Sequence, residues 1–157
     1  MPRSQPPDPT PASPTCPVAR SVDVIGDKWS LMILRDVFDG VHRFGDIQRN
    51  LGVARNILSG RLGRLVEAGI LQTRPASDGT NYLEYGLTSK GESLFPLIVA
   101  LQQWGERNLF ARGERHSRLV DKTTRKPLPL MSPHASDGRA VSRADTEVKL
   151  PRARRDT

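Results

Sequence analysis

The apolar positions of the chain recur with helical and strand-like periods, and the clearest helical period lies in residues 53–71. Within "VARNILSGRLGRLVEAGIL", residues 53–71, Leu58, Leu62 and Leu65 recur at i, i+4 and i+7, which predicts one buried stripe on a helix over roughly 55–68. Gly69 stands where a helix-ending glycine belongs, and apolar Ile70 follows it. The stripe accounts for one face of this helix and leaves its outer face unexplained.

Three shorter apolar periods predict helices upstream. "CPVARSVDVIG" places Pro17 at a first helical position and ends at Gly26, and "KWSLMILRDVF" follows Asp27 as its N-cap. "FGDIQRNLG" predicts a short helix that stops at Gly52. Because a turn of a few residues joins it to the 55–68 helix, the two form a helix-turn-helix arrangement.

Two strand-like runs follow directly. "ILQTRP" and "YLEYGL" flank a polar loop that holds the turn dipeptide Asp78-Gly79. A β-hairpin after the second helix of a helix-turn-helix is the wing of a winged helix. The elements therefore predict a mainly α fold with a small β-hairpin wing (α+β), a winged helix-turn-helix that dimerises.

The pattern predicts one long helix after the hairpin, over 89–110. Thr88 or Ser89 is expected to cap it, with Ser89 and Glu92 as a capping box, and Pro96 is expected to bend it. Its apolar stripe is wider than one small core needs, which makes it a candidate dimer surface together with the 16–25 helix. The candidate interface residues are Val18, Val22, Leu94, Leu97, Ile98, Leu101 and Trp104.

Composition divides the chain into three parts. Residues 1–15 contain six prolines and are expected to form a disordered arm that is not a signal peptide. Residues 16–110 hold eleven Lys or Arg and ten Asp or Glu, and form the predicted DNA-binding and dimerisation domain. Residues 111–157 hold twelve basic and six acidic residues, a basic tail that is either partly β or disordered. A high pI that comes from a tail does not by itself indicate nucleic acid.

The remaining composition limits the chemistry. The single cysteine, Cys16, excludes an internal disulfide and a cysteine-rich zinc site. A chain with so little cysteine suits the reducing cytoplasm. No apolar run is long enough to span a membrane. His42, His116 and His134 are scattered without metal-ligand spacing, and no catalytic set of side chains assembles. We therefore expect no enzyme, no metal and no cofactor.

The outer face of the 55–68 helix carries no acid before Glu67, and small and basic residues occupy it instead. A recognition helix must enter a major groove about 12 Å wide, where Asn and Arg read bases and small residues allow close approach. Wing residues reach the backbone or the minor groove. The candidate DNA-binding residues are Lys28, Arg43, Arg55, Asn56, Ser59, Gly60, Arg61, Arg64, Arg74, Ser77, Thr80 and Asn81.

In combination, several landmarks over residues 16–110 resemble the HxlR-type winged helix-turn-helix regulators, a MarR-like winged-helix family. They are Cys16-Pro17, Gly26-x-Lys28-Trp29, Arg43-Phe44, Leu58-Ser59, Leu62-x-x-Leu65, Gly69, Glu84-Tyr85-x-Leu87-Thr88 and Pro96 to Trp104. Two positions depart from the pattern. The family often has glycine where Asp27 stands, and Ala54 or Arg55 replaces the usual Ser or Thr cap of the recognition helix.

The resemblance implies a homodimer that binds double-stranded DNA, and some members sense thiol chemistry through the N-terminal Cys-Pro. Cys16 is expected at a helix N-terminus with Arg20 four residues on, an environment that favours the thiolate. It is a candidate sensor of an oxidant or electrophile, and the alternative is a small packing residue at the dimer seam. The predicted function is a regulator, a repressor of a pseudo-palindromic operator. The alternative function is a protein-interaction module whose basic tail contacts a partner.

Overall fold

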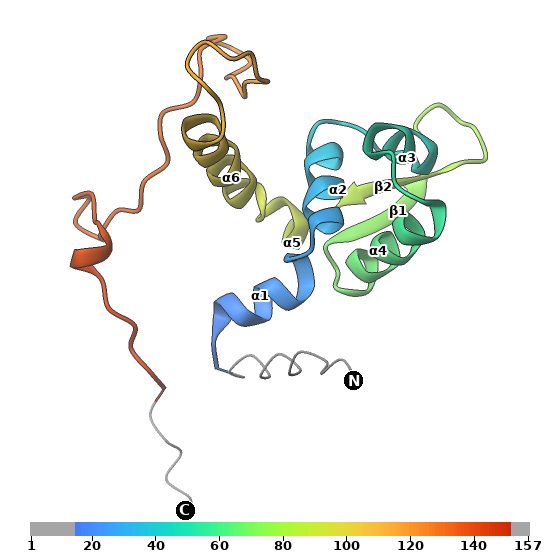
Figure 1. Cartoon of the computed structure of the whole chain (residues 1–157). Coiled ribbons are helices and arrows are strands. Elements are labelled where there is room, and N and C mark those ends of the chain that lie inside the picture. The colour runs from blue at the N-terminus through green and yellow to red at the C-terminus, as the bar shows by residue number, and fades with distance from the viewer. Residues whose placement is uncertain (1–14, 152–157) are drawn as a thin grey trace, which may run out of the picture. The chain divides into compact units, whose positions relative to one another are not determined.

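The computed structural model describes residues 15–151, so the predicted disordered arm lies outside the described residues except for Thr15. The chain divides between Leu94 and Phe95 into two compact units, each described by itself. The first unit is a winged helix (Figure 1). Its elements in chain order are α1 (Pro17–Ile25), α2 (Lys28–Phe38), α3 (Phe44–Leu51), α4 (Arg55–Glu67), β1 (Leu71–Pro75), β2 (Leu83–Leu87) and α5 (Ser89–Glu92).

The predicted stripe of α4 forms the centre of the first unit. Leu58, Leu62 and Leu65 are fully buried there together with Ile33 of α2 and Ile47 of α3. At the end of α4, Gly69 has a φ of 71°. The N–H groups of Gly69 and Ile70 donate to the carbonyls of Val66 and Leu65 at 2.9 and 3.0 Å, the pair of bonds of a Schellman ending. The predicted helix and its termination are both confirmed.

The N-terminus of α2 is capped as predicted. Asp27 accepts from the backbone N–H of Ser30 at 2.9 Å and from its hydroxyl at 2.6 Å. The interior of α2 is more polar than its apolar period suggests, because Ser30 and Asp36 are both buried. The Asp36 carboxylate accepts from Arg35 at 2.6 Å and from the side-chain amide of Asn50 at 3.4 Å, which ties α2 to the end of α3.

The hairpin pairs β1 with β2 in antiparallel register, with Leu71 opposite Leu87 and Pro75 opposite Leu83. The turn before α3 adds a short third edge, which the sequence did not indicate. Arg43 forms a single bridge with Glu84, and the N–H of Tyr85 donates to the carbonyl of His42 at 2.8 Å. A one-residue bridge has no alternating pattern to detect. It places the start of α3 beside the base of the wing.

The prediction of one helix over 89–110 is wrong in extent. Thr88 is the N-cap, as one of the two expected residues, and its hydroxyl accepts from the N–H of Gly91 at 3.0 Å. The helix then stops at Glu92, and a new helix, α6 (Phe95–Asn108), begins after a turn. The cause is Pro96, which has no N–H to donate to the carbonyl four residues back and whose ring clashes with it. Proline is tolerated in the first turn of a helix, where it stands in α6.

The second unit consists of α6 and the tail that follows it. Within residues 111–151 the tail makes turns, the single bridges Val120–Pro127 and His134–Ala140, and a 3-10 turn, η1 (Arg143–Asp145), but no strand. The tail is nevertheless held to α6, because the amide of Gln103 donates to the carbonyl of Pro129 at 2.9 Å. Among residues 15–151, no helix has the length and apolar character needed to cross a membrane.

Candidate nucleic-acid interface

The outer face of α4 is exposed along its length. Arg55, Asn56, Ser59 and Arg64 are exposed, while the leucine stripe opposite them is fully buried. No acidic residue of α4 lies on this face before Glu67 at its last position. The arrangement is a positively charged helix surface with short side chains at its middle.

Two glycines within this face have no structural role inside the chain. A side chain added at Gly60 or Gly63 meets no atom of the described residues within 4 Å, and neither glycine has a positive φ. Glycine in a helix interior is less stable than alanine by roughly 0.5–1 kcal/mol. Neither packing within the described residues nor backbone conformation therefore requires glycine at these two positions.

The first turn of α4 also lacks partners of its own. Ala54 occupies the N-cap position and makes no side-chain cap bond, as the sequence predicted, and no acid stands in the first turn. The Arg55 guanidinium lies 5.1 Å from the centre of the Phe44 ring, which holds its charge beside this end of the helix. Free N–H groups and a nearby arginine make a place for a phosphate.

Arg61 and Arg64 both reach toward other helices. The Arg61 guanidinium lies 3.0 Å from the Asp27 carboxylate and is half-buried, so Asp27 both caps α2 and pairs with α4. Arg64 remains exposed and donates to the carbonyl of Asp23 in α1 at 3.3 Å. Burial raises the pKa of Asp27, but the hydrogen bonds from Ser30 and the charges of Arg61 and Arg64 outweigh it and leave that pKa below its usual value.

The base of the wing is a charge cluster centred on Glu84. This carboxylate is 5% exposed and lies 3.8 Å from Arg43 Nε and 3.6 Å from Arg74 Nε. It also accepts from the backbone N–H and hydroxyl of Ser77 at 3.4 and 3.3 Å. Glu84 is one of the family landmarks, but its pairing with two arginines was not predictable from the sequence. Its position fixes both arginines at the foot of the wing.

The wing tip contains a second acid that was not predicted to act there. Asp78 pairs with Arg43 and accepts from the N–H and hydroxyl of Thr80 at 3.1 and 2.7 Å. The hydrogen bond from the Thr80 hydroxyl, followed by that from Arg43, lowers the pKa of Asp78 to about 2. Asn81 is exposed on the same loop.

Lys28 stands at the first position of α2, exposed, with its ammonium 4.8 Å from the centre of the Trp29 ring. In chain order it directly follows Asp27, the partner of Arg61. The twelve predicted DNA-binding residues are thus distributed over the start of α2, the start of α3, the outer face of α4 and the wing.

Cys16 is the N-cap of α1, the position the sequence predicted. The residue is half-buried, and its sulfur accepts from the N–H of Ala19 at 3.4 Å. Val18 and Val22 follow it on α1 and are 70% and 57% exposed, a large apolar surface for one short helix.

The predicted interface residues of the second unit are also exposed to solvent or half-buried. Leu97, Leu101 and Trp104 are 40%, 46% and 54% exposed, whereas Val99 is the one buried residue of α6. Ile98 is half-buried, as is Leu94 at the end of the first unit.

Comparison with known proteins assigns the arrangement to a family. A model of HxlR-like helix-turn-helix proteins matches residues 24–112, which contain α2 to α6. The chain belongs to the HxlR-like helix-turn-helix family. This family is one of transcriptional regulators and not of enzymes, as the resemblance implied.

Relatives of this HxlR-like chain carry matching descriptions. It is 47% identical over 92 residues to uncharacterized HTH-type transcriptional regulators of Mycobacterium bovis and Mycobacterium tuberculosis. The match covers 59% of this chain and 58% of each relative, so the chain spans less than two thirds of their length.

Solved structures extend the likeness. The crystal structure of PA1607, assigned as a candidate transcription factor, is 48% identical with a TM-score of 0.83, over 88% of this chain and 97% of that one. The redox regulator HypR in its reduced form is 29% identical with a TM-score of 0.54, over 60% of this chain and 94% of HypR. The winged-helix prediction is confirmed by these neighbours.

Proposed function

We propose that this HxlR-like protein binds double-stranded DNA as a homodimeric repressor of a pseudo-palindromic operator, with α4 in the major groove. The observation that carries the proposal is the outer face of α4, which is free of acid and contains two glycines with no role inside the chain. A helix surface of this kind matches the narrow and anionic space of a major groove.

The contacts divide by chemistry. Asn56, Ser59 and Gly60 lie on the outer face of α4 and are proposed to meet base edges, with Arg55 and Arg64 at either end for guanine or phosphate. Arg61 is proposed to act indirectly, because its pairing with Asp27 orients α4 on α2. The proposed backbone and wing contacts are Lys28, Arg43, Arg74, Ser77, Thr80 and Asn81.

The experiment is selection of bound sequences from a random duplex pool, followed by affinity measurements on the selected site. A pseudo-palindromic site whose affinity falls steeply with salt is expected, since phosphate contacts release counterions. Asn56→Ala should relax the preference at one position in each half-site. Failure to enrich any sequence would refute the proposal.

The competing function, a tail that binds another protein, has a direct test in the full chain. Changing Arg112, Arg115, Arg125 and Arg139 to Gln removes four charges of the tail and leaves α4 intact. Specific DNA affinity is expected to persist in this variant, whereas its loss would assign the interaction to the tail.

We further propose that the exposed apolar residues of α1 and α6 hold the two chains together. Both helices expose clusters of large apolar side chains, which monomeric proteins seldom leave open to solvent. These residues are Val18 and Val22 on α1 and Leu97, Leu101 and Trp104 on α6. A symmetric dimer buries each surface on both chains at once and sets the distance between the two copies of α4.

Cys16 is proposed to couple thiol oxidation to DNA affinity. Its place as the cap of α1, two residues before Val18 and six before Val22, puts any modification beside the proposed interface. As the only cysteine, it forms disulfides only to a second chain or to a small thiol. HypR, a neighbour in structure, is a redox regulator.

The test compares the wild type with Cys16→Ser, each reduced and then treated with diamide or a quinone. Loss of operator affinity in the wild type alone supports the switch. An equal response of the two proteins makes Cys16 a packing residue.

A further inference from the structure

The helix α6 has two faces of different character. Its turn of about 100° per residue separates the exposed apolar residues from a second set that faces the tail. The first set is Leu97, Leu101 and Trp104, and the second is Val99, Gln102, Gln103 and Glu106. The apolar and amide surface of the second set is therefore engaged within the unit and remains distinct from the proposed dimer surface.

The tail is fastened to this second face at two places. The Gln102 amide donates to the carbonyl of Ser117 at 3.3 Å. The Gln103 amide donates to the carbonyl of Pro129 at 2.9 Å, and its oxygen accepts from the N–H of Met131 at 2.8 Å. Between these attachments the tail does not fill the space beside α6, and a cavity of about 320 Å³ remains, a size within the usual range of small-molecule sites.

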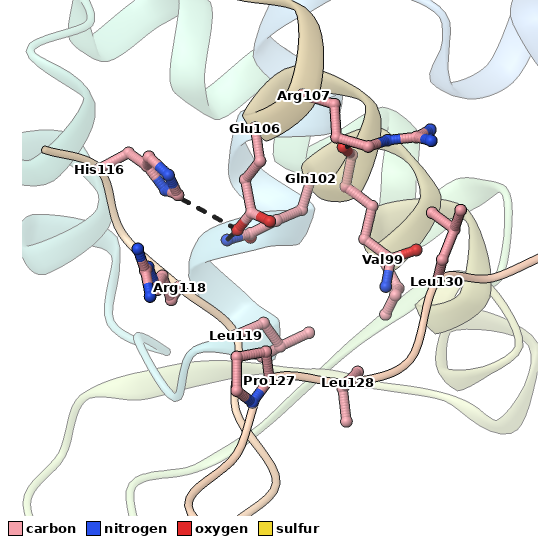
Figure 2. Close-up of a pocket in the computed structure, with 11 residues that line it drawn as sticks. Val99, Gln102, Glu106, Arg107, His116, Arg118, Leu119, Pro127, Leu128 and Leu130 are labelled. Atoms are coloured by element: carbon pink, nitrogen blue, oxygen red, sulfur yellow. Dashed lines mark hydrogen bonds and ion pairs between the residues drawn. The ribbon is translucent and has the colours of Figure 1, made fainter. Parts of the chain in front are cut away.

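One wall of this cavity is apolar. Leu119, Leu128 and Leu130 of the tail line it together with the buried Val99 of α6 (Figure 2). Such a wall favours contact with the hydrocarbon part of a ligand, because the removal of apolar surface from water is favourable.

The polar groups of the cavity indicate the charge of the ligand. The Glu106 carboxylate is already occupied, since one oxygen accepts from Gln102 at 3.1 Å and lies 3.9 Å from His116 Nδ1. The Arg118 guanidinium lines the same cavity, and no hydrogen bond or ion pair joins it to another residue within 15–151. Arg107 adds a second guanidinium at the rim, held by a bond from its Nε to the carbonyl of Gln103.

We propose that the cavity between α6 and residues 116–130 binds a small organic acid, with its apolar body against the leucines and its carboxylate at Arg118. Two arginines against one engaged glutamate give the lining a positive balance, and the guanidinium fork matches a carboxylate with two parallel hydrogen bonds. The inference goes beyond the proposed DNA binding and is independent of it.

The test uses three probes of one size, namely phenylacetate, phenylacetamide and phenethylamine, which carry a negative, a neutral and a positive head. Calorimetry and NMR titration of the full chain without DNA measure their dissociation constants. Phenylacetate is expected to bind at least tenfold more tightly than the other two, and to shift the signals of the His116 ring and the Gln103 amide.

Arg118→Gln, an exposed position, is expected to weaken phenylacetate binding about tenfold, while Arg112→Gln on the same tail leaves it unchanged. The proposal is overturned if the three probes bind equally, if Arg118→Gln binds like the wild type, or if millimolar phenylacetate gives no saturable signal. Because DNA is absent, each of these results leaves the proposed DNA binding standing.

Discussion

At the residue scale, the basic side chains near α4 and the wing are oriented by acids. Glu84 stands between Arg43 and Arg74, Asp78 pairs with Arg43, and Asp27 pairs with Arg61. An arginine that is already held in place loses less side-chain entropy when it meets a phosphate. The acids are therefore positioning groups on the surface that we propose to bind DNA.

Asp78 gives the first prediction, which concerns pH. Hydrogen bonds from Thr80 and Arg43 lower its pKa to about 2, below the ordinary value of 3.8. A carboxylate with a lowered pKa stabilises the folded wing above pH 3.8, and that contribution is lost as the pH falls through about 2. An NMR titration of the side-chain carboxyl should give a midpoint near 2 in the wild type.

Thr80→Ala provides the matched comparison, because it removes the first of these hydrogen bonds and leaves Arg43. The midpoint of Asp78 should rise toward the ordinary value in this variant. A wild-type midpoint near 3.8 would show that the wing tip is not held as described.

At the element scale, the outer face of α4 was predictable from the sequence. The contacts that join α4 to α1, and the start of α3 to the wing, were not. The buried leucines recur within one helix, so a local period reveals them and the acid-free face opposite. Arg43 and Asp78 lie 35 residues apart, and Arg64 and the Asp23 carbonyl 41 apart. No spacing rule connects such distant positions, so contacts of this kind emerge only from the packed fold.

The end of the winged helix shows the same limit in another form. The apolar period of 94–104 continues through Pro96, so the sequence predicted a bend in one helix. Instead, α5 ends at Glu92, the chain turns at Ser93 and Leu94, and a separate helix, α6, begins at Phe95. A hydrophobic pattern records which residues are apolar, but it does not decide whether a proline bends a helix or ends it.

The glycines of α4 give a prediction on stability and binding. Gly60→Ala should raise the free energy of unfolding by about 0.5–1 kcal/mol, because the added methyl meets open space and the helix gains propensity. Gly60→Gln should lower operator affinity, since the longer side chain occupies the space that DNA would fill. Urea unfolding and titration of labelled operator measure the two effects.

Thr123→Gln is the control, because it places the same side chain at an exposed position of the tail, outside α4, the wing and α6. It should leave operator affinity unchanged. If Gly60→Gln binds the operator as tightly as the wild type, the groove assignment of α4 is wrong.

Asp27 gives a prediction on the joint between α2 and α4. Asp27→Ala removes the cap of α2, worth about 1 kcal/mol, and leaves the half-buried Arg61 without its partner. The free energy of unfolding should fall by roughly 1–2 kcal/mol in urea. Asp27→Asn keeps a cap acceptor but not the charge, so it should be less destabilising.

Asp39→Ala at the other end of α2 is the control, since Asp39 is exposed and bonds there only through its backbone. It should change stability by no more than about 0.5 kcal/mol. Equal stabilities of Asp27→Ala and Asp39→Ala would contradict the double role of Asp27.

At the scale of the whole molecule, the functional unit is proposed to be two chains. In this proposal one copy of α4 would read one half-site, and the two copies of a symmetric dimer would read half-sites one duplex turn, about 34 Å, apart. The tail is connected to this proposed dimer through α6. One face of α6 binds residues 116–130, and the other face exposes Leu97, Leu101 and Trp104. A ligand in the cavity would thus act on the same helix that is proposed to join the chains.

Leu101→Glu gives the last prediction. The wild type should scatter light as twice the chain mass of 17.4 kDa. A charge placed on the exposed face of α6 would have to be desolvated in the dimer, so this variant should scatter as a single chain. Its affinity for the full operator should fall to that for one half-site, because the second contact is no longer tethered to the first. Val148→Glu changes an even more exposed apolar residue outside α6 and should remain dimeric. A wild-type monomer that binds a single half-site tightly would show that α1 and α6 serve another purpose.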